Sequence, residues 1–256
     1  MKTKFIISKY GLVLLAAALC TLSCKKDEMS YYDQPYAITF LGTDNRGRDS
    51  DDPSTLNASL NFASRILDMT AEGIDTITVK LRLQGNLSDK PLRVSIYSEK
   101  DENYPFAVVK PMNPYVIDDS TYRVVIKVPV QCPAERHKDY KAILKFDYGN
   151  SDVIAGFNTL QTFTVTLKDE FSQSMITGLN YWSYDYQPVI GDYSENKVRF
   201  MIEFAQTYNF QSFFGYYGPS AAKAQELRDA LKAYNDANPG NPLKDEDGNL
   251  ISFDPA

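Results

Sequence analysis

The side chains with the clearest potential for chemistry in this 256-residue chain are three cysteines and a single histidine. His137 lies in a run of charged residues and no Gly-x-Ser-x-Gly motif accompanies it, so the sequence does not indicate a Ser-His-Asp hydrolase. Cys132 ends an apolar, strand-like run and is predicted to be a packed, unreactive thiol. The cysteines and the histidine are not clustered as zinc ligands would be, and no cofactor is expected.

Carboxylate pairs are the remaining route to catalysis, because glycoside hydrolysis needs two of them. The chain has 33 acidic residues, and nothing in the sequence singles out a pair. We therefore expect a protein that is not an enzyme, with a surface hydrolase as the weaker alternative.

Cys24 is the cysteine whose surroundings indicate a specific reaction. An apolar run over residues 11–22 follows a basic start, and the small Ser23 precedes Cys24. The run is shorter than the ~20 residues that span a bilayer, so it is typical of a cleaved signal peptide. We expect Cys24 to be lipidated and to become the first residue of the mature chain. Cys20 is a poorer candidate, because the bulky Leu19 precedes it. An ordinary secreted protein is the other interpretation.

The residues after Cys24 bear on which membrane face carries the protein. Lys26, Asp27 and Glu28 resemble the short basic-acidic-acidic signal that sends Bacteroidota lipoproteins to the outer face of the outer membrane. The alternative is a charged, solvated tether. With the lipid anchor, this resemblance implies a location on the outer membrane, facing the cell exterior.

Composition indicates a folded globular protein and excludes nucleic acid as a partner. Hydrophobic residues make up 43% of the chain and charged residues 23%, which is close to globular averages. The formal net charge of −6 offers no basic face for nucleic acid. The chain has 18 tyrosines and 14 phenylalanines, and such rings serve both cores and binding surfaces.

Alternating patterns predict about seven short strands before residue 169. The clearest is Thr76–Leu83, in which every second residue is apolar. This pattern is typical of an immunoglobulin-like antiparallel β-sandwich, although no cysteine pair or central tryptophan accompanies it. The other predicted strands are Ala37–Phe40, Asn61–Ile66, Leu92–Tyr97, Tyr122–Val128, Tyr140–Phe146 and Phe163–Leu167.

The C-terminal part has a mixed pattern, which predicts a smaller α+β region. Val198–Phe204 is interpreted as a strand, Ser220 as the start of a helix, and Asp247-Gly248 as a hairpin turn. The spacing around Gly248 does not fit a calcium loop. The expected organisation is a signal peptide (1–23), a tether (24–34), a β-sandwich domain (35–168) and an α+β C-terminal region (169–256).

An aromatic run is the best candidate for a binding site. On a strand, Trp182, Tyr184 and Tyr186 would share one face, which could stack on sugar rings or anchor a protein partner. The competing interpretation is a packing seam. A second run, Tyr208–Tyr217, is interpreted as core.

Two short triplets are candidates for modification. Thr76 and Ser120 each follow an aspartate, as in the Asp-Ser/Thr-apolar acceptor for O-glycosylation in these bacteria, although Thr121 fits the apolar position poorly. Both hydroxyls could equally be plain solvent-facing groups.

The chain resembles an uncharacterised Bacteroidota family of lipoproteins that are usually encoded beside SusC/SusD-like outer-membrane importers. The resemblance covers the lipidated start, Tyr36–Phe40, Asp75–Leu81 and the segment from Trp182 through Gly191–Phe200. It implies a non-catalytic accessory of a nutrient importer, with a glycan or an oligopeptide as cargo. A stand-alone glycan-binding lipoprotein is the alternative.

Overall fold

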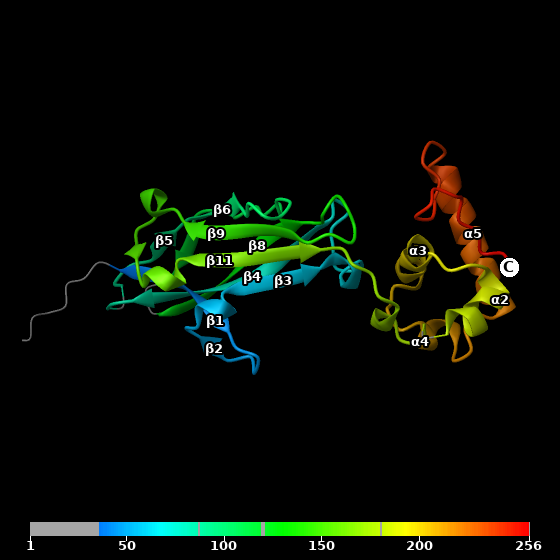
Figure 1. Ribbon diagram of the computed structural model, residues 1–256, viewed down its shortest axis with the longest axis horizontal. Coiled ribbons are helices and arrows are strands. Elements are labelled where there is room, and N and C mark those ends of the chain that lie inside the picture. Colours follow the sequence, from blue (N-terminus) through cyan, green and yellow to red (C-terminus); the bar gives the residue numbers. More distant parts are fainter. Residues whose placement is uncertain (1–35, 87, 119–120, 180, 256) are drawn as a thin grey trace, which may run out of the picture. The chain divides into compact units, whose positions relative to one another are not determined.

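The computed structural model describes residues 36–86, 88–118, 121–179 and 181–255. The predicted export and lipidation residues Cys24, Lys26, Asp27 and Glu28, together with Ser120, lie outside these ranges. The first part of the described chain forms two main sheets (Figure 1). One sheet has the order β10 (Ile154–Ala155), β1 (Ala37–Thr43), β4 (Ile74–Gln84) and β8 (Arg123–Gln131), with β2 (Asp49–Ser50) paired to β1.

The second sheet has four strands, and a separate ribbon has two. Most neighbouring strands are antiparallel, whereas the pairs β1–β10 and β3–β11 are parallel. The second sheet has the order β3 (Asn57–Asn61), β11 (Thr162–Lys168), β9 (Tyr140–Phe146) and β6 (Ile96–Lys100), and the ribbon joins β5 (Leu92–Val94) to β7 (Tyr115–Ile117).

Strand β4 shows why this part of the sequence folds as a sheet. Ile77, Val79 and Leu81 are buried, while the residues between them face outward. This two-residue period is that of a strand with one face on a core. Strand β8 pairs along β4 from Gln131 to Arg123, so the alternating pattern also fixes the register.

The two sheets enclose one hydrophobic core, which confirms the predicted β-sandwich. Phe40 of β1 stacks on Phe146 of β9, with ring centroids 4.2 Å apart. The ring centroid of Phe40 also lies 5.6 Å from that of Phe163 of β11. Because β1 belongs to one sheet and β9 and β11 to the other, these rings join the two layers.

Two of the predicted strands were wrong in extent. In Asn61–Ile66 only Asn61 is in a strand: its side chain accepts a hydrogen bond from Ala63 N, and a 3₁₀ turn, η2 (Phe62–Ser64), begins there. Leu92–Tyr97 is divided at Ser95, whose hydroxyl donates to Asn150 O. The two halves therefore join different sheets.

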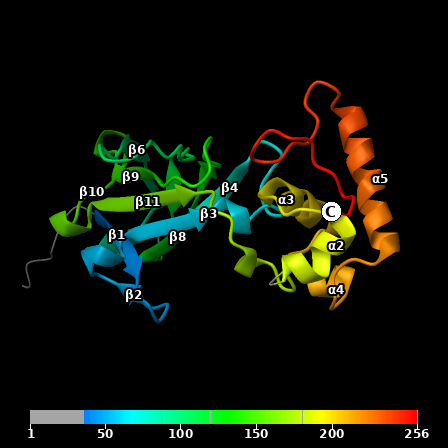
Figure 2. The ribbon, with the colours of Figure 1, turned by 45° about the vertical axis from the view of Figure 1, so that its right-hand side comes forward.

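The described residues after β11 form a helical region with its own core (Figure 2). This region is the smaller part of a mainly β protein. Its β content in the described residues is limited to single bridges, such as the one that pairs Lys244 with Leu250. Its helical elements are η5 (Gln173–Met175), the π-helical turn η6 (Trp182–Tyr186), α2 (Gln187–Ile190), α3 (Glu195–Ala205), α4 (Phe210–Phe214) and α5 (Ala221–Ala237).

The prediction of a strand over Val198–Phe204 was wrong, because this segment lies inside α3. Ser194 caps the helix by accepting a hydrogen bond from Lys197 N at 3.0 Å. The helix is buried on most of its sides, and its buried residues include the charged Glu195, Lys197 and Arg199. These buried charges interrupt the apolar stripe from which a helical period is read in a sequence.

Helix α5 and the C-terminal hairpin follow their predictions. Ser220 accepts a hydrogen bond from Lys223 N at the start of α5. The hairpin turns at Gly248, where φ is +85°, a conformation that glycine adopts without strain. The Asp245 carboxylate accepts hydrogen bonds from the backbone N–H groups inside this turn.

A buried arginine connects α3 to the end of the sandwich. Arg199 donates to Asp169, the residue after β11, and to Glu195, each at 2.6 Å. All three side chains are largely buried, so removal of one partner would leave an uncompensated charge. His137 is exposed, and its Nε2 lies 3.2 Å from Oε2 of Glu195, next to this cluster.

Substitution of Phe40 tests the sandwich core. Phe40→Ala should lower the free energy of unfolding by about 3–5 kcal/mol, because it removes a fully buried ring from the contact between sheets. Val125→Ala, at an exposed position on β8, should change it by less than about 0.5 kcal/mol. Urea denaturation followed by circular dichroism measures both values. Equal effects of the two substitutions would contradict the packing described.

Candidate functional site

The predicted aromatic site does not have the geometry of a strand. Residues 182–186 form the π-helical turn η6, in which Gln187 N donates to Trp182 O. Trp182 and Tyr186 therefore point to the same side, with stacked rings 5.2 Å apart. Trp182 is 6% exposed and Tyr186 is fully buried, whereas Tyr184 is 81% exposed. The prediction that the three rings share one open face was wrong.

Trp182 and Tyr186 instead belong to the core of the helical region. The Trp182 indole N–H donates to Gly191 O at 3.1 Å, and Tyr193 contacts the ring edge-on. Burial raises the pKa of Tyr186 well above its usual value, and the neighbouring Asp185 carboxylate adds to this effect. The packing interpretation therefore describes these two residues.

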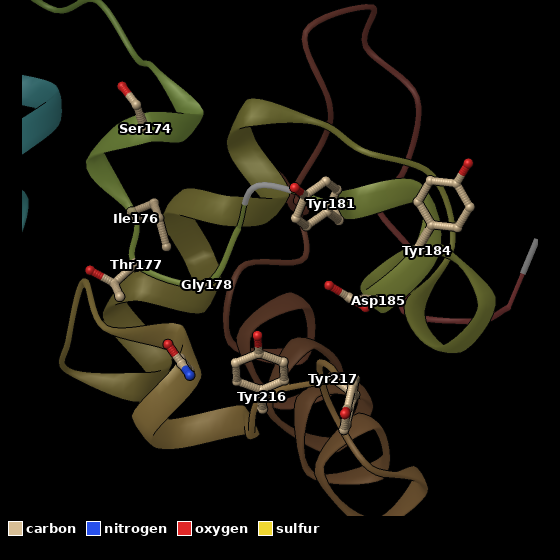
Figure 3. Close-up of a pocket in the computed structure, with 10 residues that line it drawn as sticks. Ser174, Ile176, Thr177, Gly178, Tyr181, Tyr184, Asp185, Tyr216 and Tyr217 are labelled. Carbon is tan, nitrogen blue, oxygen red and sulfur yellow. The ribbon is translucent and has the colours of Figure 1, made fainter.

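The exposed tyrosine of this turn lines an open pocket of about 690 Å³. Tyr181 and Tyr184 lie on one side of it, and Tyr216 and Tyr217, which follow α4, lie on the other (Figure 3). The four side chains are between 65% and 81% exposed. Tyr216 and Tyr217 meet edge to face at 5.0 Å and thus present differently oriented ring faces. Four uncovered rings around one pocket are typical of a binding surface.

The remaining lining is small and polar. Ser174, Thr177 and Gln211 provide hydroxyl and amide groups, and Asp185 is the charged residue of the lining. In the described chain, the Asp185 carboxylate makes no hydrogen bond or ion pair. Figure 3 shows Asp185 between the two pairs of tyrosines. The lining is completed by Ile176 and Gly178.

Two glycines fix the walls of the pocket. A Cβ at Gly218 would lie 2.1 Å from the carbonyl oxygen of Asp185, so only glycine allows the loop after α4 to approach η6 this closely. A Cβ at Gly178 would lie 2.8 Å from Gln211 N. Both glycines have positive φ, +80° and +92° respectively. The backbone therefore holds the tyrosine-bearing segments together without a ligand.

Of the four tyrosines of this pocket, only Tyr184 was among the predicted site residues. Tyr216 and Tyr217 belong to the second aromatic run, which was interpreted as core, and Phe210 and Phe214 of that run are indeed buried. The two tyrosines differ in that Gly215 and Gly218 flank them. Paired glycines around adjacent rings are a turn signal that could have separated them from the core.

Other candidate residues lie apart from the pocket. Cys132 is a half-buried free thiol, and burial raises its pKa to about 11, in agreement with the predicted unreactive role. Thr76 is exposed on β4, and its modification stays a prediction. Among the described residues, no group of three or more His, Cys, Asp or Glu is placed to hold a metal ion. No helix in the described ranges is long and apolar enough to cross a membrane.

Comparison with known proteins gives no family for this chain. No protein-family model and no curated protein matches the chain. The apo form of the Calx CBD1 domain is 10% identical with a TM-score of 0.33, over 54% of this chain and 100% of that chain. EndoBT-3987 of Bacteroides thetaiotaomicron, with its Man5GlcNAc product, is 6% identical with a TM-score of 0.32, over 52% and 30% respectively. A Bacteroides ovatus protein of unknown function is 9% identical with a TM-score of 0.32, over 51% and 43%.

Substitution of Trp182 distinguishes packing from binding. Trp182→Ala should lower the free energy of unfolding by about 3–5 kcal/mol, because the indole is buried and hydrogen-bonded. Tyr184→Ala, in the same turn but exposed, should change it by less than about 0.5 kcal/mol. Thermal and urea unfolding measure both. An unchanged stability of Trp182→Ala would contradict the core position of the ring.

Proposed function

We propose that this chain is a non-catalytic, surface-exposed outer-membrane lipoprotein that captures a glycan beside a SusC/SusD-like importer. The observation that carries the binding role is the pocket in which four exposed tyrosines surround small polar side chains. The location and the importer come from the predicted lipidation at Cys24 and from the family resemblance of the sequence.

The chemistry of the pocket favours a sugar. Tyrosine rings present apolar faces on which the C–H face of a sugar ring can stack, and their hydroxyls reach water. Ser174, Thr177 and Gln211 supply donors and acceptors for sugar hydroxyls. The rings are already in place and have few rotatable bonds, so ligand binding orders little of the protein.

The number of carboxylates in the site favours a binding role over hydrolysis. Glycosidases place two carboxyl groups about 5–10 Å apart across the scissile bond. Asp185 is the single carboxylate among the described residues that line this pocket. A single carboxylate can orient a sugar but lacks the second group that would act as acid or nucleophile.

Loss of an exposed tyrosine should weaken glycan binding without unfolding the protein. We expect Tyr184→Ala and Tyr217→Ala each to lower the affinity about tenfold, because a stacked ring contributes on the order of 1 kcal/mol beyond its buried area. Tyr122→Ala, an exposed tyrosine outside this pocket, is the matched control. A glycan array identifies a glycan that binds, and titration calorimetry then measures the affinity of each variant for it. Full binding by the double variant Tyr184→Ala/Tyr217→Ala would overturn the assignment of the pocket.

A second experiment tests the anchor and the importer. Cys24→Ala should move the protein out of the outer-membrane fraction, because one acylated cysteine is the proposed attachment. The wild-type lipoprotein, purified from outer membranes in mild detergent, should bring a stoichiometric SusC/SusD-like pair with it. Unchanged attachment of Cys24→Ala would contradict the anchor. Purification of a bare lipoprotein would favour a stand-alone glycan binder.

A further inference from the structure

The pocket carries an uncompensated negative charge. The side chain of Asp185 is half-buried, and none of the described residues forms an ion pair or hydrogen bond with it. No lysine, arginine or histidine is among the residues that line the pocket. Several other aspartates of the chain have a cation beside them, such as Asp49 with Lys80 and Asp152 with Arg93. The part of the chain that the structure describes provides no such cation for Asp185, nor a hydrogen-bond donor like those that Asp101 and Asp245 have.

The rings around Asp185 also favour a positively charged ligand. The face of an aromatic ring carries the negative end of its quadrupole, which attracts cations within about 6 Å of the centroid. Tyr181 and Tyr184 lie on one side of Asp185 and Tyr216 and Tyr217 on the other (Figure 3). The last two rings meet at 80°, so two differently directed faces are available. A carboxylate among several ring faces is a site for an ammonium group.

We propose that the pocket recognises an amino sugar with a free, protonated amino group, whose ammonium pairs with Asp185 while the sugar ring stacks on the tyrosines. This inference rests on the proposed glycan-binding function and narrows its substrate class. Glycans with carboxylate or sulfate groups would place a second negative charge beside Asp185 and are disfavoured. N-acetylated sugars lack the cation and therefore leave Asp185 without an ionic partner.

The elements that build the pocket favour a sugar over a basic peptide. Peptides are commonly held by main-chain hydrogen bonds along a sheet edge or in a helix groove. This lining comes from turns and short helical segments. The backbone of Thr177 is already used, since its N–H donates to Tyr208 O and its carbonyl accepts from Gln211 N. The lining offers a ligand side-chain hydroxyls, an amide and ring faces, and these groups match a sugar.

A pair of oligosaccharides that differ only in acetylation tests the proposal. The probes are the β-1,4-linked glucosamine hexamer and its fully N-acetylated counterpart, measured by titration calorimetry near pH 5, because glucosamine amines are weaker bases than the lysine amine and are protonated only in mild acid. A salt concentration of about 0.15 M screens contacts with distant surface charges. We expect the wild-type protein to bind the free-amine hexamer about tenfold more tightly than the acetylated one.

Two variants assign the preference to the pocket. Asp185→Asn keeps the shape of the side chain and should remove the difference between the two hexamers. Asp247→Asn makes the same charge change in the exposed C-terminal turn, outside the pocket lining, and should leave the difference intact. Melting temperatures of both variants show whether they are folded, and the comparison of hexamers on the wild-type protein needs no variant.

Each outcome decides the matter. Tighter binding of the free-amine hexamer that is lost in Asp185→Asn supports the proposal. Equal affinity for both hexamers overturns the amino-sugar inference and leaves the glycan-binding function standing. If Asp247→Asn also removes the preference for the free-amine hexamer, the assignment of that preference to the pocket is overturned. Binding of neither hexamer overturns the inference, and tighter binding of a lysine-containing peptide, measured in parallel, overturns the sugar assignment.

Discussion

The stack of Trp182 on Tyr186 is the contact on which the helical region and its pocket depend. A π-helical turn has more than four residues per turn, so side chains four apart lie nearly above one another. Burying this pair determines the direction of the residues between them: Tyr184 is exposed and lines the pocket together with Asp185. The indole hydrogen bond to Gly191 O fixes the turn further. The buried residues Trp182 and Tyr186 thus position Tyr184 and Asp185, which are the residues of this turn that can contact a ligand.

The opposite wall of the pocket is held close to η6 by a backbone contact. Gly218 comes so close to the carbonyl of Asp185 that no other residue fits there without a shift. The loop with Tyr216 and Tyr217 is therefore placed against η6 in the free protein. Preformed ring surfaces of this kind lose little conformational entropy on binding, which is how a small, open site can reach useful affinity. The unpaired carboxylate beside these rings then determines which sugars fit.

Much of the sandwich could be predicted from the sequence, because a strand with one buried face repeats every two residues, as β4 does. The helical region was harder to predict from the sequence. Val198–Phe204 alternates well enough to be interpreted as a strand, and the capping hydroxyl of Ser194 is the signal that identifies α3. The predicted aromatic run contains Tyr184 of the true site, but a π-helical turn leaves no recognisable spacing in the sequence. Tyr216 and Tyr217 were hidden because their run also supplies core phenylalanines.

Tyrosine-selective NMR can show whether the tyrosine pocket is where this protein binds its ligand. Ring-labelled protein would be titrated with a glucosamine oligosaccharide, and the ring resonances assigned by single Tyr→Phe substitutions. If the ligand binds in the pocket, the resonances of Tyr181, Tyr184, Tyr216 and Tyr217 should shift together and saturate at one ligand concentration. Shifts confined to tyrosines of the sandwich, such as Tyr97 and Tyr122, would contradict it, as would the absence of any shift.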